Sequence, residues 1–151
     1  MISIVPYQSQ YASAFYSLNK QWIETFFVME PEDYRTLENP ETYIIDQGGF
    51  IFVALLDEKP VGVCALIKRE NNEFELSKMA VFPAAQGLKI GLLLAQNIIE
   101  KARAIHVEKL FLISNSKLIP ALTLYEKVGF RYIKKFKSVY SRGNVKMEMV
   151  L

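Results

Sequence analysis

A strand, a glycine-containing loop and a long helix are predicted in direct succession, and this segment constrains the fold most. Glu73–Phe82 reads as a strand that ends at Pro83. Two glycines follow, and over Leu88–Ile105 apolar residues recur in steps of three and four, as on one face of an amphipathic helix. The start of such a helix offers unpaired N–H groups and about half a positive charge. The segment predicts an α/β fold, and its loop suits either a phosphate group or a plain strand–helix turn.

Strands and helices are predicted on both sides of this segment. The further strands are Ile2–Val5, Phe50–Leu56, Val61–Lys68, Lys109–Ser114, Phe130–Lys134 and Asn144–Leu151, and the further helices are Gln8–Phe27, Pro31 to about Asn39, and Pro120–Val128. This order predicts one α/β domain over residues 1–151, with a central mixed, mostly antiparallel sheet of about six to seven strands and about four helices.

Composition excludes several classes of protein. The 151 residues are 51% hydrophobic and 23% charged, which is typical of a compact domain rather than a disordered chain. A net charge of +2 without a basic block argues against nucleic-acid binding. One cysteine, Cys64, and one histidine, His106, make an internal disulfide or a His-rich metal site impossible. No apolar run approaches the ~20 residues of a membrane span. A cytoplasmic protein that uses no metal and binds neither nucleic acid nor membrane is expected.

Three motifs, in order and spacing, resemble the GNAT superfamily of acyl-CoA-dependent N-acyltransferases. Met79-Ala-Val followed by Gln86-Gly-x-x-x-Gly91 is similar to the family signature Q/R-x-x-G-x-G/A. Asn115 follows the predicted strand after the long helix, and Tyr125-Glu-Lys-Val-Gly-Phe130 is similar to the family's Y-x-K-x-G-F helix end. The resemblance implies the family's fold, in which two parallel strands splay apart around acetyl-CoA.

The resemblance also implies how acetyl-CoA is held. Backbone groups of the strand would bond the pantetheine, the glycine loop would surround the pyrophosphate, and an asparagine side chain would contact the cofactor: Met79, Ala80 and Val81; Gln86, Gly87, Leu88, Lys89, Ile90 and Gly91; and Asn115. Lys89 departs from the family, which has a glycine there. A positive φ would strain a lysine, and its side chain would either contact phosphate or face solvent.

The resemblance and the strand pattern together suggest catalytic residues. Tyr125 matches the family's catalytic tyrosine, which stabilises the departing thiolate, although an ordinary core aromatic also fits its helix. Strict alternation places Glu75 on the same face of its strand as Met79, where some relatives carry a glutamate base. Glu73 and an ordered water are the alternative bases. A strand N–H near Met79 is the natural donor to the thioester oxygen.

The acceptor side of the site is the least defined by sequence. Trp22, Phe26 and Phe27 are candidates for the substrate pocket from one side and Tyr140 from the other, although helical spacing also places the first three in the core. The resemblance implies an acetyl-CoA-dependent N-acetyltransferase that acts on a primary amine of a small molecule or peptide, as a monomer or homodimer. A noncatalytic acyl-CoA-binding or sensing module is the alternative, and the retained Tyr125 favours the enzyme.

Overall fold

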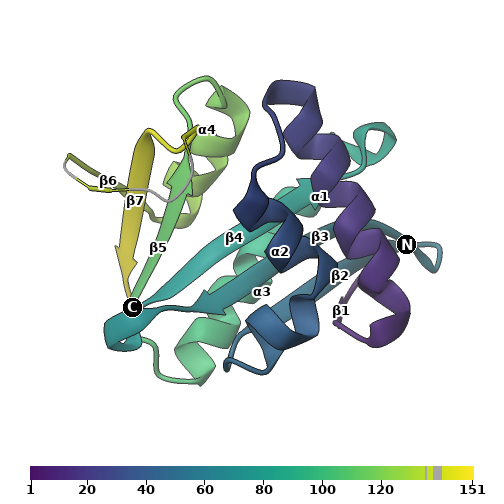
Figure 1. Cartoon of the computed structure of the whole chain (residues 1–151), viewed down its shortest axis with the longest axis horizontal. Coiled ribbons are helices and arrows are strands. Elements are labelled where there is room, and N and C mark those ends of the chain that lie inside the picture. Colours follow the sequence, from purple (N-terminus) through teal and green to yellow (C-terminus); the bar gives the residue numbers. More distant parts are fainter. Residues whose placement is uncertain (135, 138–140) are drawn as a thin grey trace.

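A computed structural model gives the three-dimensional arrangement and describes residues 1–134, 136–137 and 141–151. Its strands are β1 Ile2–Pro6, β2 Phe50–Leu56, β3 Lys59–Lys68, β4 Phe74–Val81, β5 Lys109–Ser114, β6 Arg131–Ile133 and β7 Val145–Val150. Its α-helices are α1 Ala12–Phe26, α2 Pro31–Glu38, α3 Ile90–Ala104 and α4 Ile119–Val128. The strands form one mixed sheet in the order β1-β2-β3-β4-β5-β7-β6 (Figure 1). The predicted α/β fold, sheet type and helix number are confirmed.

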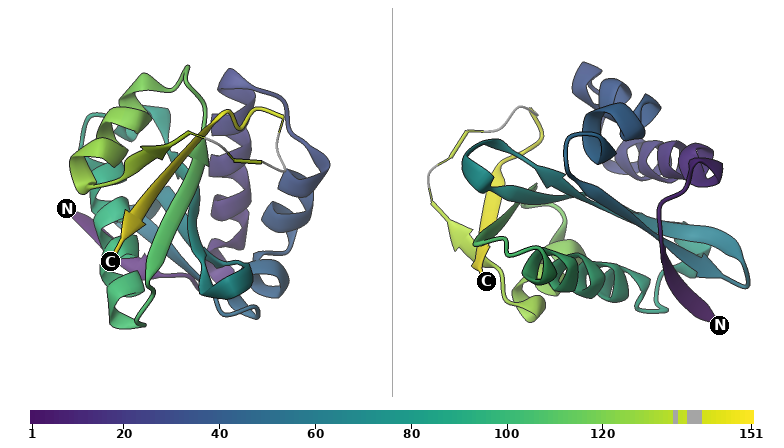
Figure 2. Two further views of the ribbon diagram at one scale, coloured as in Figure 1. Left: turned by 90° about the vertical axis from the view of Figure 1, so that its left-hand side faces the viewer. Right: turned by 90° about the horizontal axis from the view of Figure 1, so that it is seen from below.

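Helices cover both faces of the sheet and bury a core on each. Helices α1 and α2 lie on one face and α3 on the other (Figure 2). Phe15 of α1 and Leu37 of α2 pack in the first core, whereas Leu94 of α3 and Leu122 of α4 pack in the second. This three-layer arrangement follows from the apolar stripes of the helices, each of which needs a sheet face to cover. Cys64 is fully buried in the second core, as its apolar strand predicts.

Strands β4 and β5 are parallel neighbours that separate soon after they meet. Their pairing consists of Phe74 with Leu110 and Glu75 with Phe111, at the start of each strand. Beyond these pairs β4 stays bonded to β3, and β5 stays bonded to β7 over its full length. The two halves of the sheet therefore diverge, which confirms the expected pair of splayed parallel strands.

A β-bulge interrupts β4 where it leaves β5. The register between β3 and β4 shifts there, so that Lys78 and Met79 together lie opposite Cys64. Lys78 has a φ of +55°, in the left-handed region that non-glycine residues seldom occupy. A bulge adds one residue to a strand, leaves it unpaired in the ladder and turns the side chains that follow.

The bulge reverses which face of the sheet the later β4 residues occupy. Leu76 and Met79 pack on the α3 side, whereas Ala80 packs on the α1 side. Lys78 contacts Asp33 of α2 on that same α1 side. Strict alternation would have placed Leu76, Lys78 and Ala80 on one face. The predicted common face for Glu75 and Met79 is therefore wrong, because the inserted residue changes the parity of the strand.

Smaller differences from the predicted spans lie at element ends. Helix α1 begins at Ala12 rather than Gln8 because Ser9–Tyr11 forms a 3₁₀ turn, and α3 begins at Ile90 rather than Leu88. A π-helical turn at Glu41–Ile45 was not predicted. Within the described residues, none of the helices has the length and apolar character needed to cross a bilayer.

Candidate active site

Two cavities meet where β4 and β5 diverge. The larger has a volume of about 580 Å³ and the smaller about 100 Å³. Their shared walls come from α1, β4, α4 and the residue before α4: Trp22, Met79, Leu118, Ala121 and Tyr125. The place where the two cavities meet, between Met79 at the bulge and Tyr125 of α4, is called the junction here. The larger cavity lies on one side of the junction and the smaller on the other.

The larger cavity contains most of the predicted cofactor-binding residues. Its lining includes Met79, Ala80 and Val81 of β4 and Gln86, Gly87, Lys89, Ile90 and Gly91 of the loop and helix start. Leu88 is not part of the lining, and its side chain is exposed. Gly87 has a φ of +92° and open space around the position of a Cβ, so backbone conformation rather than crowding requires glycine there.

Lys89 occupies the position before α3 with a φ of +61°. The strain expected for lysine at the family's glycine position is therefore present, at a cost of about 1–2 kcal/mol for the left-handed region. Lys89 also lines the larger cavity. Lys89 is also exposed, so its position fits both the phosphate contact and the solvent-facing alternative, and the phosphate contact stays a prediction.

Lysines dominate the charge of the larger cavity. Lys117 and Lys127 line it together with Lys89, and none of its described lining residues is acidic. Lys117 also lies over the ring of Phe27, with Nζ 5.7 Å from the centroid. Three ammonium groups and a helix N-terminus suit a diphosphate. Sequence reasoning assigned no role to Lys117, which lies two residues after Asn115, or to Lys127, which is the lysine of the Tyr125–Phe130 motif. Among the described residues no cluster of metal-ligating side chains is present.

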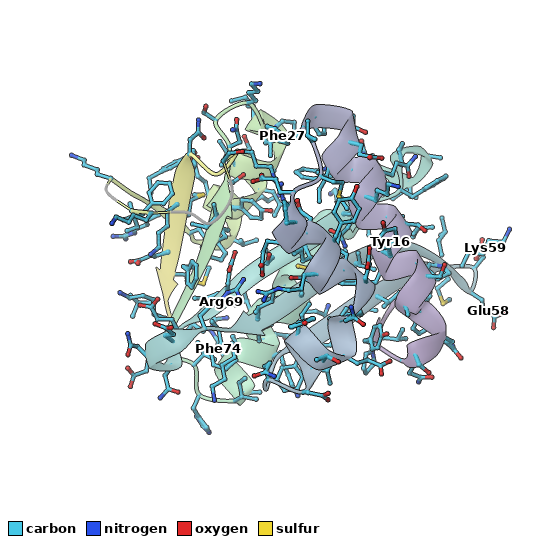
Figure 3. All side chains as sticks on the ribbon, viewed as in Figure 1. Tyr16, Phe27, Glu58, Lys59, Arg69 and Phe74 are labelled. Atoms are coloured by element: carbon cyan, nitrogen blue, oxygen red, sulfur yellow. The ribbon has the colours of Figure 1, made fainter. Side chains whose placement is uncertain are left out.

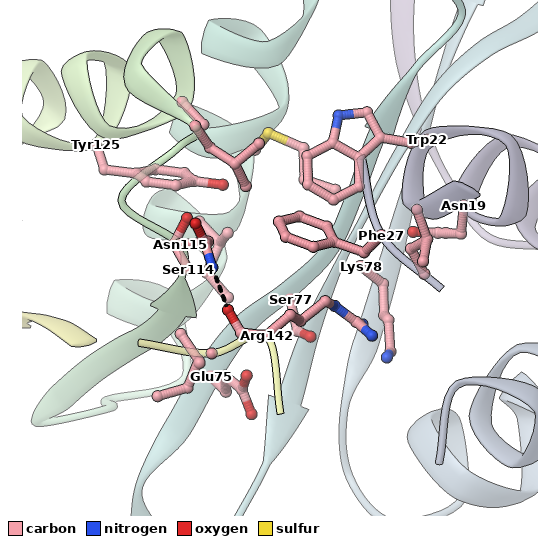
Figure 4. Close-up of a pocket in the computed structure, with 17 residues that line it drawn as sticks. Asn19, Trp22, Phe27, Glu75, Ser77, Lys78, Ser114, Asn115, Tyr125 and Arg142 are labelled. Carbon is pink, nitrogen blue, oxygen red and sulfur yellow. Dashed lines mark hydrogen bonds between the residues drawn. The ribbon is translucent and has the colours of Figure 1, made fainter. Parts of the chain in front are cut away.

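Tyr125 lies at the junction and lines both cavities. Its side chain is buried and packs edge-on against Phe130, with centroids 6.0 Å apart. Its hydroxyl points toward the smaller cavity (Figure 4). Burial raises the pKa of Tyr125 well above the ordinary phenol value, because the phenolate would be poorly solvated. Tyr125 therefore stays a neutral hydrogen-bond donor at physiological pH.

Glu75 lines the smaller cavity from the start of β4. Its side chain is only 8% exposed, and its carboxylate accepts a hydrogen bond from Nε of Arg69 at 2.9 Å and forms an ion pair with Nη2 at 2.8 Å. Arg69 follows β3 and lies close to the start of β4 (Figure 3). Glu73 precedes β4 and does not line the cavity. Of the two predicted glutamates, only Glu75 therefore lines the smaller cavity, and its role as base stays a prediction.

Asn115 follows β5 and lines the smaller cavity rather than the larger. Its Nδ2 donates to the backbone oxygen of Arg142 at 2.6 Å (Figure 4). Its Oδ1 accepts from the backbone N–H of Lys117 at 2.9 Å. The two ends of the amide thus bond the backbone of two segments, one that follows β5 and one that precedes β7. These bonds favour a strand-end turn, and the cofactor contact stays a prediction.

The predicted aromatic residues of α1 surround the junction. Trp22 lines both cavities, Phe26 the larger and Phe27 the smaller. Trp22 and Phe26 pack against each other, with ring centroids 5.5 Å apart. All three are therefore placed to contact ligands, in addition to the packing that helical spacing predicts. Tyr140, the fourth candidate, lies outside the described residues.

A buried charge cluster beside the smaller cavity was not foreseen from the sequence. Asp33 of α2 is fully buried and accepts hydrogen bonds from Arg142 at 2.7 and 2.8 Å and from Lys78 at 3.3 Å. Arg142 also contacts Glu30 at 3.0 Å. The residues of this charge cluster come from three distant parts of the chain. No local sequence pattern could have revealed the cluster.

Burial and pairing shift the pKa values within this cluster in opposing ways. Burial lowers the pKa of Lys78, although the nearby carboxylates of Asp33 and Glu75 oppose that shift. Burial by itself would raise the pKa of Asp33, but hydrogen bonds from Arg142 and the Glu30 backbone, with the charge of Lys78, hold it below its usual value. Asp33 is therefore the anion that keeps two cations beside the cavity.

Known proteins share this fold, and a family model matches most of the chain. The acetyltransferase (GNAT) family matches residues 15–130. The structure of a GNAT-family acetyltransferase from Staphylococcus aureus Mu50 matches with a TM-score of 0.89 and 25% identity, over 99% of each chain. The PaiA N-acetyltransferase of Thermoplasma acidophilum, in complex with coenzyme A, matches with a TM-score of 0.77 and 15% identity, over 100% of this chain and 99% of that one, and so shares the fold.

A curated relative matches over a shorter stretch. The N-acetylaspartate synthetase of Xenopus tropicalis is 34% identical over 95 residues, which are 62% of this chain and 35% of the relative. The chain thus spans about a third of the length of that protein. The family match, in contrast, covers well over half of this chain. The chain therefore belongs to the acetyltransferase (GNAT) family, a family of acyl-CoA-dependent N-acyltransferases.

Proposed function

We propose that the protein is an acetyl-CoA-dependent N-acetyltransferase that transfers the acetyl group to a primary amine. The junction of two unlike cavities at Met79 and Tyr125 carries this proposal. The larger cavity has the loop, lysines and helix start that suit a diphosphate. The smaller cavity has carboxylate, amide and hydroxyl groups that suit a polar acceptor. A thioester at the junction would be reached from both sides.

Direct attack explains the groups at the junction. The base takes a proton from the acceptor ammonium, and the free amine then forms a bond to the thioester carbon. As the carbon–sulfur bond breaks, nitrogen loses a second proton and the departing thiolate takes up one. The bulge at Lys78 and Met79 leaves a β4 backbone N–H outside the ladder, which suits the developing charge on the carbonyl oxygen. A thiol has a pKa of about 8.5. Because the pKa of Tyr125 is raised, we infer that it stabilises the thiolate by a hydrogen bond rather than by complete proton transfer.

Turnover with a defined panel of amines tests this function. Purified protein is mixed with acetyl-CoA and with amino acids, aliphatic amines, polyamines or short peptides, and thiol release is followed over time. At least one amine should increase thiol release above the rate without acceptor, with a matching acetylated product by mass. Tight binding of acetyl-CoA with no amine-dependent release would instead favour the noncatalytic sensing module.

Replacing Glu75 by glutamine tests the proposed general base. If Glu75 accepts the ammonium proton, the E75Q variant should lose about 10²-fold or more in kcat/KM. Its pH–rate profile should also lack the acidic limb of the wild type, since that limb reports protonation of the base. The matched variant E73Q removes the carboxylate that lies outside the cavity and should keep both rate and profile. An E75Q profile with the wild-type acidic limb would assign the proton to water or another group.

A further inference from the structure

The smaller cavity presents opposite charges on its two sides. Lys78 and Arg142 both line it, and their side-chain nitrogens lie together on the side of α1 and α2 (Figure 4). Glu75 lines it on the side of β5, where its carboxylate is seen in the same view. The polar wall of this cavity therefore has a positive end and a negative end.

The carboxylates that pair with Lys78 and Arg142 at the positive end lie outside the lining of the cavity. Asp33 and Glu30 bond Arg142, and Asp33 also bonds Lys78, yet neither carboxylate lines the cavity. The two basic residues therefore line the cavity, whereas the carboxylates that pair with them do not. The bulge matters here, because it turns Lys78 toward Asp33 rather than toward the α3 core.

Among the described residues, the ion pairs that surround the cavity contain equal numbers of positive and negative groups. Lys78, Arg142 and Arg69 carry three positive charges, and three carboxylates pair with them: Glu30, Asp33 and Glu75. A buried charge without a partner is costly, so a neutral but polarised site disfavours a ligand with a net charge. A zwitterion brings one charge of each sign and leaves the sum unchanged.

The volume of the smaller cavity matches a small acceptor. A group the size of a water molecule occupies ~10–15 Å³ of cavity volume. A cavity of about 100 Å³ therefore holds a group of roughly seven to ten atoms. This is the size of a small free amino acid. The end of a polypeptide would have to place further residues outside the cavity.

We propose that the acceptor is a small free amino acid, whose carboxylate binds Lys78 and Arg142 while its amine lies between Glu75 and the Met79–Tyr125 junction. The inference rests on the proposed function and specifies its substrate. The α-nitrogen gains the acetyl carbon and loses two protons: one passes to solvent through the base, and one neutralises the thiolate of coenzyme A after it departs. The product is a carboxylate without an ammonium group. It no longer matches a neutral site, which favours its release.

Matched sets of acceptors test the inference on the wild-type protein. For the best amino acid of the panel, kcat/KM is compared with that of its carboxamide and of the amine that lacks the carboxylate altogether. Hydrogen bonds to a charged partner predict a loss of about 10- to 100-fold for both analogues. Equal rates for all three, or a preference for a polyamine or peptide, would overturn the inference while the proposed function stood. Absence of turnover with every amine would overturn the proposed function itself.

A variant that removes one positive charge tests whether Lys78 causes the preference for an amino acid over its carboxamide. K78M should lower kcat/KM for the amino acid by at least about 10-fold but change the rate with the carboxamide by less than about 3-fold. Arg35 provides a matched control, because R35Q removes one positive charge from the outer surface of α2, where Arg35 pairs with Glu32. R35Q should keep the full amino-acid preference. Equal losses for both acceptors in K78M, with an unchanged melting temperature, would contradict carboxylate recognition. If K78M does not fold, the comparison of the three acceptors on the wild-type protein still tests the inference.

Discussion

Replacing Tyr125 by phenylalanine is expected to lower kcat by about 10²- to 10³-fold. Only the hydroxyl is lost, and that hydroxyl points into the smaller cavity beside the junction (Figure 4). The edge-on packing against Phe130 remains available to a phenylalanine ring, so the fold should persist. Because the hydroxyl is proposed to act on the departing thiolate, the Kd for acetyl-CoA should change by less than about 3-fold. Steady-state thiol release and equilibrium titration of the cosubstrate give the two values.

Tyr132 supplies the control for this experiment. It is half exposed on β6 and lines neither cavity, so Y132F should behave as the wild type in both measurements. A Y125F variant that kept the wild-type kcat would remove Tyr125 from the mechanism and leave it as a core aromatic. A large rise in the Kd for acetyl-CoA with unchanged kcat would make it a binding residue instead.

Replacing Asp33 by asparagine is expected to cause the largest loss of stability in the site. The side chain is fully buried and joins Lys78 and Arg142. Removing one partner from a buried ionic cluster leaves uncompensated charge and costs about 3–5 kcal/mol in the free energy of unfolding. At about 2–4 °C per kcal/mol, the melting temperature should fall by roughly 6–20 °C. Urea and thermal unfolding of the purified variant provide the measurement.

A surface carboxylate provides the comparison for Asp33. Asp57 pairs with the N-terminal ammonium at 3.0 Å, and both groups are largely exposed. D57N should therefore cost less than about 1 kcal/mol. Similar losses for D33N and D57N would show that the buried cluster does not stabilise the fold.

The pH dependence of stability gives an independent readout. Because the pKa of Asp33 is lowered in the folded protein, its contribution is complete above its ordinary value of about 4. That contribution is lost as the pH falls through the lowered pKa. D33N should therefore lose less stability than the wild type on acidification over this window. Unfolding at a series of acidic pH values tests the sign.

Local patterns were sufficient to predict most of the secondary structure. The strands Phe50–Leu56 and Lys109–Ser114 have the predicted bounds, because each is a short run of β-forming residues between turns. Helix α4 begins near Pro120 and ends before Gly129, as the preferences of proline and glycine predict. The predicted ends of the elements were less accurate, since a 3₁₀ turn and a π-helical turn have no strong sequence signal.

Irregular backbone limited what the strand pattern could predict. The period of two along β4 assumes a continuous ladder, and the bulge at Lys78 and Met79 breaks that assumption. The motif still located Met79 beside the larger cavity because its spacing to Gln86 is local. It gave no sign that Lys78 turns toward α2. Glu75 reached the smaller cavity even so, since it precedes the bulge.

The amino-acid sequence by itself determined the order of elements, the glycine loop before α3 and the position of Tyr125 on α4. These features depend on residues within a few positions of one another, so periodicity and motif spacing contain them. Only the tertiary structure decided what the acceptor meets. Asp33 bonds Lys78 across 45 positions and Arg142 across 109, and such contacts form only when the sheet and helices have packed. The charge pattern of the smaller cavity is therefore a property of the fold rather than of any one segment.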